Sequence, residues 1–183
     1  MSARAEELRA VLSSLVRDVA DFPEPGIIFK DISPLLADHR GFSAVIEALA
    51  DCGRDGDGTV VVDKVVGIEA RGFILAAPVA LSLGTGFVPV RKVGKLPGPT
   101  HQETYALEYG EATLEIHQDA FQAGERALVI DDVLATGGTV NATRLLLERC
   151  GATVAGVAVL IELGFLGGRE ALRPLDLSAL MTA

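Results

Sequence analysis

The chain has 183 residues, of which 49% are hydrophobic and 22% are charged, and its formal net charge is −9. This length and composition predict a single folded domain over residues 1–183 and exclude a disordered chain. The acidic balance argues against binding to nucleic acid or to an acidic membrane, and the apolar runs are far shorter than the roughly 18 residues that a membrane helix needs.

The amino-terminal residues have neither the basic start nor the apolar stretch of a secretion signal, which indicates a cytoplasmic protein. Cys52 and Cys150 have no spacing typical of a metal site. We expect them as free thiols rather than as a disulfide, in agreement with a reducing compartment.

Helical spacing of apolar residues predicts an amphipathic helix over 4–19. Pro23, Pro25 and Gly26 then break the helix, so residues 27–29 are expected in an extended or turn conformation. The elements expected after them are, in chain order, helix 41–52, an exposed turn 52–58, strand 59–68, helix 73–83, strand 86–92, a mobile segment 93–104, a hairpin 104–121, strand 126–132, helix 138–149, strand 153–163 and a turn with a short helix at 164–170. Apolar strands that alternate with helices predict an α/β fold with a central, mostly parallel sheet flanked by helices.

The segment "VIDDVLATGGT", residues 129–139, continues an apolar strand and precedes a predicted helix. Asp131 and Asp132 can accept hydrogen bonds from vicinal hydroxyl groups or hold a hydrated Mg²⁺. The Gly-Gly turn lets backbone N–H groups converge on a dianion, and the start of the helix adds its positive end. A sugar phosphate meets both requirements, whereas a plain strand end and a plain turn would explain each feature only separately.

This segment resembles the phosphoribosyl pyrophosphate (PRPP) motif of the type I phosphoribosyltransferases. Five further segments resemble the adenine-specific branch of that family, in the same order, over roughly residues 20–170. They are "FPEPGIIFKDISPLL", "GIEARGF", "VRKVGKLPGPT", "YALEYGEATLEIHQDA" and "LIEL". The resemblance implies the type I phosphoribosyltransferase fold, with hood elements at about 20–37 and 104–118 and a mobile loop at about 92–104 over the site.

The resemblance also implies an activity, which is a glycosyltransferase reaction of purine salvage. Such an enzyme transfers the 5-phosphoribosyl group of PRPP to N9 of adenine and yields AMP and pyrophosphate. Mg²⁺ is the implied cofactor, bound chiefly through PRPP, with Asp131 and Asp132 in reach through water. The implied assembly is a homodimer in which loop bases act across the interface, and neither nucleic acid nor a membrane is an expected partner.

The site residues that the resemblance implies fall into four groups. The catalytic residues are Glu108, which exchanges the proton of the purine ring, and Arg71, Asp131 and Asp132. The residues that bind the 5′-phosphate are Ala135, Thr136, Gly137, Gly138 and Thr139. The residues that bind pyrophosphate, with a cis peptide bond expected between the first two, are Glu69, Ala70, Arg71, Arg91, Lys92 and Lys95. The residues that bind adenine are Ile27, Ile28, Phe29 and Leu163, and the hood contributes Tyr109.

Ordinary structural roles stay open for several of these residues. Arg71 could face solvent at a helix start, the basic cluster could be solvated surface charge, and Glu108 could be an exposed strand carboxylate. The apolar residues of the adenine group fit a hydrophobic core equally well. Family members often have arginine after the phenylalanine of the adenine slot, whereas Lys30 stands there in this chain, which weakens a stacking role for that position.

Two other functions are open. An oxopurine such as hypoxanthine or xanthine could be the acceptor on the same scaffold, although no lysine lies next to the strand that ends at Leu163 to serve an oxo group. A non-catalytic regulator that senses PRPP or a purine is the other alternative. Such regulators usually have a nucleic-acid-binding element, and this chain shows an acidic amino-terminal helix without an added domain.

Overall fold

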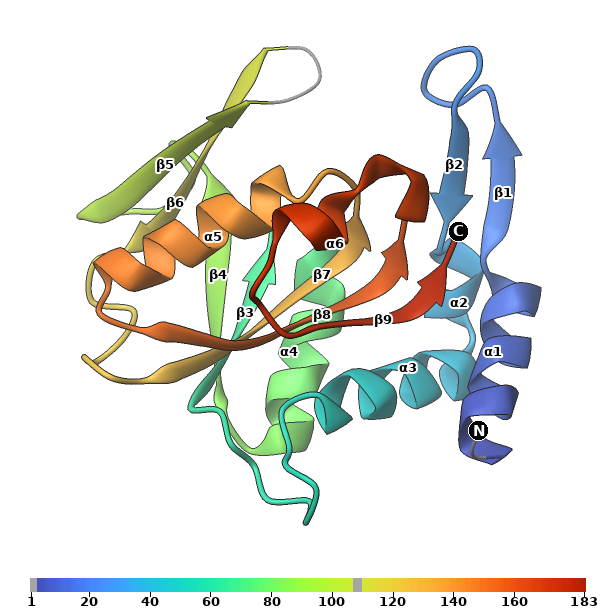
Figure 1. Cartoon of the computed structure of the whole chain (residues 1–183), viewed down its shortest axis with the longest axis horizontal. Helices are drawn as coiled ribbons and strands as arrows, with labels where there is room; N and C mark the ends of the chain where they lie inside the picture. The colour runs from blue at the N-terminus through green and yellow to red at the C-terminus, as the bar shows by residue number, and fades with distance from the viewer. Residues whose placement is uncertain (1–2, 107–109) are drawn as a thin grey trace. The chain divides into compact units, whose positions relative to one another are not determined.

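The structure is a computed structural model that describes residues 3–106 and 110–183. It divides near residue 47 into two compact units. Unit 1 ends at Glu47 and unit 2 runs from Ala48 to Ala183, and each has its own helices and strands (Figure 1).

Unit 1 has a short β-hairpin between helices. Its elements are α1 (Ala3–Leu15), β1 (Arg17–Ala20), β2 (Ile28–Asp31), α2 (Ser33–Ala37) and most of α3 (His39–Asp51). The two strands pair antiparallel, and an ion pair of 2.9 Å joins Arg17 Nη2 to Asp31 Oδ2 across them. A second ion pair of 2.7 Å joins Lys30 Nζ to Asp18 Oδ1.

The predicted helix over 4–19 is therefore wrong beyond Leu15. Val19 pairs with Phe29 in the β-ladder instead of continuing the helix. A β-branched residue suits a strand at least as well as a helix, and the cross-strand ion pairs add to the hairpin. The expectation of an extended conformation near residues 27–29 is confirmed by β2.

Unit 2 is built on a sheet that has seven strands among the described residues. The strands are β3 (Lys64–Ile68), β4 (Gly86–Lys92), β5 (Thr100–Ala106), β6 (Glu111–His117), β7 (Arg126–Leu134), β8 (Thr153–Glu162) and β9 (Leu177–Thr182). Their order across the sheet is β5-β6-β4-β3-β7-β8-β9. The five strands from β4 to β9 in that order are parallel, and the β5–β6 hairpin joins them antiparallel, which confirms the mostly parallel sheet.

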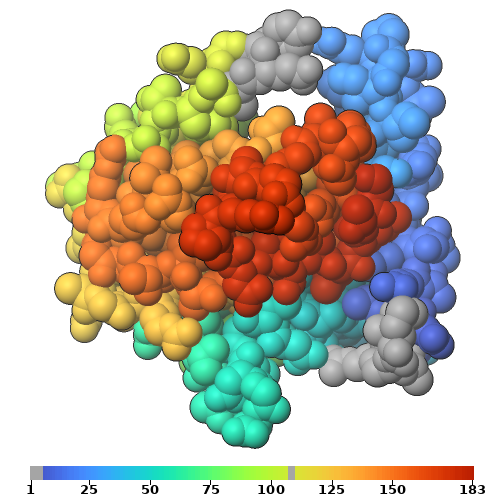
Figure 2. All heavy atoms as spheres, in the orientation of Figure 1, coloured from blue at the N-terminus to red at the C-terminus, as the bar shows by residue number. Residues whose placement is uncertain are grey.

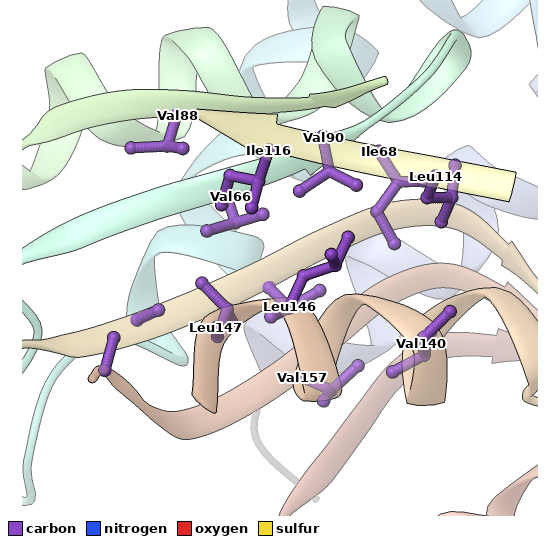
Figure 3. Packing of buried hydrophobic residues seen from close by; sticks show 14 of the residues in the cluster. Val66, Ile68, Val88, Val90, Leu114, Ile116, Val140, Leu146, Leu147 and Val157 are labelled. Carbon is purple, nitrogen blue, oxygen red and sulfur yellow. The ribbon is translucent and has the colours of Figure 1, made fainter. Parts of the chain in front are cut away.

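Helices α4 (Arg71–Leu83) and α5 (Gly138–Arg149) cover opposite faces of this sheet. Side chains alternate between faces along a strand, so Val66 and Gly67 of β3 point to different sides. Val66 belongs to the core cluster with Leu146 of α5, as Figure 3 shows. A Cβ on Gly67 would lie 2.8 Å from the Cβ of Ala76 in α4. The helices on both faces that the sequence predicts are thus confirmed.

Short elements complete unit 2. A 3₁₀ helix, η1 (Gly164–Leu166), and a single helical turn, α6 (Gly168–Ala171), follow β8. The exposed turn predicted after α3 projects from unit 2 at the lower edge of Figure 2. Asp55 Oδ1 holds that turn by accepting hydrogen bonds from the backbone N of Asp57 and Thr59, at 3.0 and 2.9 Å. No helix in residues 3–106 and 110–183 is both long enough and apolar enough to cross a membrane.

The strand limits differ from the expected ones in informative places. Residues 59–63 form a loop rather than the start of β3, because Asp63 Oδ2 accepts a hydrogen bond from the backbone N of Arg126 (2.7 Å). β5 begins at Thr100, inside the segment expected to be mobile. The sequence did not indicate β9, which pairs with β8 at the edge of the sheet.

Candidate functional site

Three of the predicted catalytic residues lie close together at the carboxyl ends of the parallel strands. Parallel strands β3 and β7 pair up to Gly67 and Ile130, and Asp131 and Asp132 follow on β7. Helix α4 starts at Arg71, just after the end of β3. Nη2 of Arg71 lies 2.7 Å from Oδ2 of Asp132, and the backbone N of Asp132 donates to Oδ1 of Asp131 over 2.9 Å.

The two carboxylates are buried, with exposed fractions of 9% for Asp131 and 6% for Asp132. Within the described residues, Oδ2 of Asp132 accepts no aligned hydrogen bond, although it is in ion-pair range of Arg71. Burial and then the charge of Asp132 raise the pKa of Asp131 well above its ordinary value, and Arg71 only partly opposes this. The arrangement favours a ligand that supplies hydrogen-bond donors or positive charge, such as vicinal hydroxyl groups or a hydrated cation.

The Gly-Gly turn lies between β7 and the amino-terminal end of α5. Gly137 has φ +89°, in the left-handed region that glycine adopts without strain. Among the described residues no side chain caps α5, so its first backbone N–H groups can bind an anion, and the helix dipole favours negative charge there. Thr136 is exposed and Thr139 is half-buried at this turn, where both hydroxyl groups can add donors.

Helix α6 supports the turn from behind. A Cβ on Gly168 would lie 2.2 Å from the carbonyl oxygen of Ala135, and a Cβ on Gly137 would lie 3.1 Å from the carbonyl oxygen of Gly168. The backbones can approach this closely only because both positions lack a side chain. Arg169 fixes α6 in turn, since its guanidinium binds Glu162 at the end of β8 (Nη2 to Oε2, 2.6 Å).

A second candidate site segment follows β3. The peptide bond between Glu69 and Ala70 is cis, as the resemblance implied. Glu69 is the centre of the basic cluster, because its carboxylate accepts hydrogen bonds from Lys95 Nζ (2.6 Å), Lys92 N (3.0 Å) and Arg91 Nε (3.2 Å). The structure thus brings the side chains of Arg91 and Lys95 together on one carboxylate, whereas Lys92 contributes only its backbone N–H and Arg71 pairs with Asp132.

Burial raises the pKa of Glu69, but the hydrogen bonds from Lys95, Lys92 and Arg91 more than offset it and lower that pKa to about 2. The carboxylate is consequently ionised at neutral pH and holds both cationic side chains near the start of α4. An incoming polyanion would find these cations already gathered, and it would compete with Glu69 for them.

Glu115 organises the segment that includes Lys95, and the sequence did not reveal it. It is only 2% exposed, and its Oε1 accepts hydrogen bonds from the backbone N of Lys95 and of Leu96, both at 2.8 Å. Its Oε2 accepts hydrogen bonds from Thr100 Oγ1 and Gln102 Nε2, at 3.3 and 3.5 Å. Burial raises the pKa of Glu115, but these backbone donors outweigh it and the net change is downward.

The remaining predicted residues belong to other elements or lie outside the described residues. Glu108 and Tyr109 lie in the range 107–109, which the structure does not describe. Leu163 is half-buried at the end of β8 in unit 2. In unit 1, Ile27 and Ile28 are exposed, and the ring of Phe29 makes an edge contact with Phe22 at 5.1 Å between centroids.

Tyr105 is a further residue that sequence reasoning missed. It is half-buried near the end of β5, and its hydroxyl lies 3.2 Å from Oγ1 of Thr139. The available signal was an aromatic residue in "ETYALEYG", but only the three-dimensional structure shows that it meets the Gly-Gly turn. Gly168 left a similarly weak signal in the pair "GG" at 167–168.

Comparison with known proteins gives the family. The profile of the family described as "Phosphoribosyl transferase domain" matches residues 31–174. The chain is similar to adenine phosphoribosyltransferase from a Nocardioides species, with 64% identity over 169 residues that cover 92% of this chain and 91% of the relative. It is 61% identical over 165 residues to the adenine phosphoribosyltransferase of Streptomyces coelicolor, covering 90% of this chain and 88% of the relative.

Solved structures agree with these sequence matches. The chain resembles the crystal structure of adenine phosphoribosyltransferase from Rhodothermus marinus, with a TM-score of 0.89, 48% identity and coverage of 98% of this chain and 99% of the other. It resembles the Saccharomyces cerevisiae adenine phosphoribosyltransferase with the same TM-score and coverage at 36% identity, and that protein was crystallised with an imino-altritol bisphosphate and adenine.

Proposed function

Because the chain belongs to the phosphoribosyl transferase domain family, we propose that it transfers the 5-phosphoribosyl group of PRPP to N9 of adenine, with release of pyrophosphate. This is a transferase reaction of purine salvage, and its nucleotide product is AMP. The high identity to adenine phosphoribosyltransferases over most of both chains supports adenine over an oxopurine, and it supports catalysis over a purely regulatory role.

The structural support for this proposal is the arrangement of three groups at one place in the fold. The carboxyl ends of two neighbouring strands are surrounded by three groups. They are the buried carboxylates of Asp131 and Asp132, the start of α5 and the guanidinium of Arg71. Carboxylates suit ribose hydroxyls, the helix start suits a 5′-phosphate, and the guanidinium suits a pyrophosphate. PRPP is the small molecule that has all three groups.

The reaction breaks the bond from the anomeric carbon to the pyrophosphate oxygen and forms the bond from that carbon to N9. Asp131 and Asp132 hold the ribose hydroxyls and favour the positive charge that develops at the anomeric carbon. Residues 135–139 anchor the 5′-phosphate through backbone N–H groups and the hydroxyls of Thr136 and Thr139. The departing pyrophosphate takes up negative charge. This charge is stabilised by the cationic side chains of Arg71, Arg91, Lys92 and Lys95.

The purine side of the reaction falls to other residues. We assign to Glu108 the acceptance of the N9 proton as the new bond forms, and to Tyr109 a place in the hood over the site. Phe29 is assigned to stack on adenine, with Ile27 and Ile28 as apolar contacts, and Leu163 is assigned to a separate contact with the base. Ile27 and Ile28 are 45% and 60% exposed, so they are not core residues, and as neighbours they offer an apolar surface to a ligand.

Magnesium is the proposed cofactor, carried to the site chiefly by PRPP. The fit is supported by the buried carboxylate pair and by Oδ2 of Asp132, which accepts no aligned hydrogen bond within the described residues. Asp131 and Asp132 would hold the hydrated ion through water. The ion would neutralise charge on the pyrophosphate as it leaves.

A homodimer is proposed as the working assembly, with Arg91, Lys92 and Lys95 contributed across the interface. Its support is an apolar surface on α4, where Ile74 and Leu81 are 44% and 82% exposed. These two residues are seven positions apart and share one face of the helix. A cytoplasmic location is proposed on the free thiols of Cys52 and Cys150.

The experiment that tests the proposal is a panel of acceptor bases. Purified protein is mixed with PRPP and Mg²⁺ and with adenine, hypoxanthine, guanine or xanthine in turn, and nucleotide formation is followed. AMP from adenine alone is the expected result. Product from an oxopurine would overturn the acceptor assignment, and PRPP binding without turnover on any base would favour a sensor.

A further inference from the structure

The β5–β6 hairpin lies beside α5, as the neighbouring yellow-green and orange segments of Figures 1 and 2 show. Side-chain contacts join β5 to both ends of this helix. At the carboxyl-terminal end of α5, the guanidinium of Arg149 donates to the carbonyl oxygen of Gln102 and pairs with the carboxylate of Glu103. At the amino-terminal end, Tyr105 contacts Thr139. Strand β5 therefore lies along the helix whose first turn is the proposed 5′-phosphate site.

The contact at the amino-terminal end is specific to the turn. The Tyr105 hydroxyl lies 3.2 Å from Thr139 Oγ1, and the ring packs where Gly138 has no side chain, since a Cβ there would lie 3.1 Å from Cδ2 of the ring. Thr139 is fixed from its backbone as well, because its carbonyl oxygen accepts a hydrogen bond from Thr143 Oγ1 over 2.9 Å. The Tyr105 hydroxyl thus meets a threonine hydroxyl whose backbone position is set.

The chemistry of two hydroxyl groups makes this contact sensitive to a ligand. Each hydroxyl has one proton to donate and can also accept. In the structure, Thr139 Oγ1 donates to the Tyr105 hydroxyl. When a phosphate oxygen accepts the hydrogen bond from the Thr139 hydroxyl, the Tyr105 hydroxyl can turn its own proton toward Thr139 Oγ1 without moving its oxygen. The Tyr105 hydroxyl then donates to Thr139 and holds it in the orientation that donates to the phosphate.

We propose that Tyr105 is a positioning residue that orients the Thr139 hydroxyl toward the 5′-phosphate and couples phosphate binding at α5 to the placement of the β5–β6 hairpin. This inference rests on the proposed function, because it takes the start of α5 as the 5′-phosphate site. Tyr105 does not touch the substrate. It acts through Thr139, and its loss weakens ligands that have a 5′-phosphate while ligands of the pyrophosphate subsite are unaffected.

The test uses Tyr105→Phe, which keeps the ring against Gly138 and removes only the hydroxyl. Binding of ribose 5-phosphate and of pyrophosphate is measured separately by calorimetry. A neutral hydrogen bond predicts about 5-fold weaker binding of ribose 5-phosphate and unchanged binding of pyrophosphate. The KM for PRPP should rise by a similar factor while the KM for adenine stays the same.

Thr104→Val is the matched control, because it removes a hydroxyl from the same strand. Thr104 Oγ1 is 2.8 Å from Thr113 Oγ1 on an exposed part of the hairpin, and its side chain points to the face of β5 opposite to that of Tyr105. This variant should bind ribose 5-phosphate with wild-type affinity. A loss equal to that of Tyr105→Phe would overturn the inference, because any weakening of the hairpin would then suffice.

A double-mutant cycle with Thr139 separates positioning from general destabilisation. Tyr105→Phe should cost nothing further in a Thr139→Val background, and it should cost its usual factor in a Thr139→Ser background, which keeps the hydroxyl. Equal costs in both backgrounds, or equal losses for pyrophosphate and ribose 5-phosphate, would overturn the inference.

If the wild-type protein does not bind ribose 5-phosphate at all, the proposed function fails and the inference fails with it. If it binds and Tyr105→Phe has no effect, only the inference fails.

Discussion

Glu69→Gln tests whether the basic cluster is held by charge on a single carboxylate. Glu69 accepts hydrogen bonds from Lys95 Nζ, Lys92 N and Arg91 Nε, over 2.6 to 3.2 Å. The amide of glutamine keeps nearly the same size and loses the charge. It also replaces one acceptor oxygen by a donor group, which cannot receive the hydrogen bonds that the lost oxygen received.

The expected loss in free energy of unfolding follows from the pKa of Glu69, which falls from 4.5 to about 2 on folding. Such a shift corresponds to about 3 kcal/mol if the donors act fully on the charged form. Lys95 is half exposed and Arg91 is one-third exposed, so solvent screens the pairs and about 1 to 2 kcal/mol is the expected loss at pH 7. The folded pKa lies below 4.5, so this stabilisation is present above pH 4.5 and is lost as the pH falls toward 2.

Urea unfolding at several pH values between 3 and 7 measures the effect as a difference between wild type and variant. The difference should be largest at pH 7 and should fall to roughly half of that value near pH 3. Glu170→Gln is the control, because the Glu170–Arg173 pair is well exposed and should contribute little at any pH. A Glu69→Gln cost that does not vary with pH, or that equals the cost of Glu170→Gln, would show that the charge of Glu69 does not hold the basic cluster.

Three further predictions concern the site itself. Gly168→Ala should displace the Ala135 carbonyl oxygen, because that oxygen would lie 2.2 Å from the new Cβ. The KM for PRPP should rise about 10-fold through loss of hydrogen bonds to the phosphate. An unchanged KM would show that α6 does not position the Gly-Gly turn. Asp132→Asn should lower kcat at least about 100-fold, because the amide no longer favours positive charge at the anomeric carbon. The far-UV circular dichroism spectrum should stay that of the wild type. Near-normal turnover would contradict the role of the carboxylate. Removal of divalent cations with a chelator should abolish AMP formation and excess Mg²⁺ should restore it, and full activity in the chelator would contradict the proposed cofactor.

Sequence patterns predicted the elements whose physical signal is local. The apolar strand before "DDVLATGGT" and the helix over 138–149 follow from hydrophobic runs and from a glycine turn, and β4 matches the expected 86–92. The α/β architecture followed from the alternation of these elements. The cis bond between Glu69 and Ala70 agrees with the resemblance of "GIEARGF", whereas no local pattern would have indicated it.

Elements that depend on distant partners were not predictable in the same way. Residues 17–20 form a strand because residues 28–31 offer a partner, and β9 forms because β8 does. Glu115 stands between two apolar residues of β6, Leu114 and Ile116. The alternation of side chains along a strand therefore predicts from the sequence that Glu115 points to solvent, whereas the structure buries it. Its burial is explained by the backbone N–H groups of Lys95 and Leu96, which lie far from it in sequence.

A ³¹P NMR time course of PRPP with adenine, Mg²⁺ and the purified protein tests phosphoribosyl transfer directly. We expect the PRPP signals to decay while AMP and pyrophosphate appear in equal amounts, with no reaction when adenine is omitted. Formation of ribose 5-phosphate with pyrophosphate, or PRPP that persists unchanged beside adenine, would contradict transfer of the phosphoribosyl group by this chain.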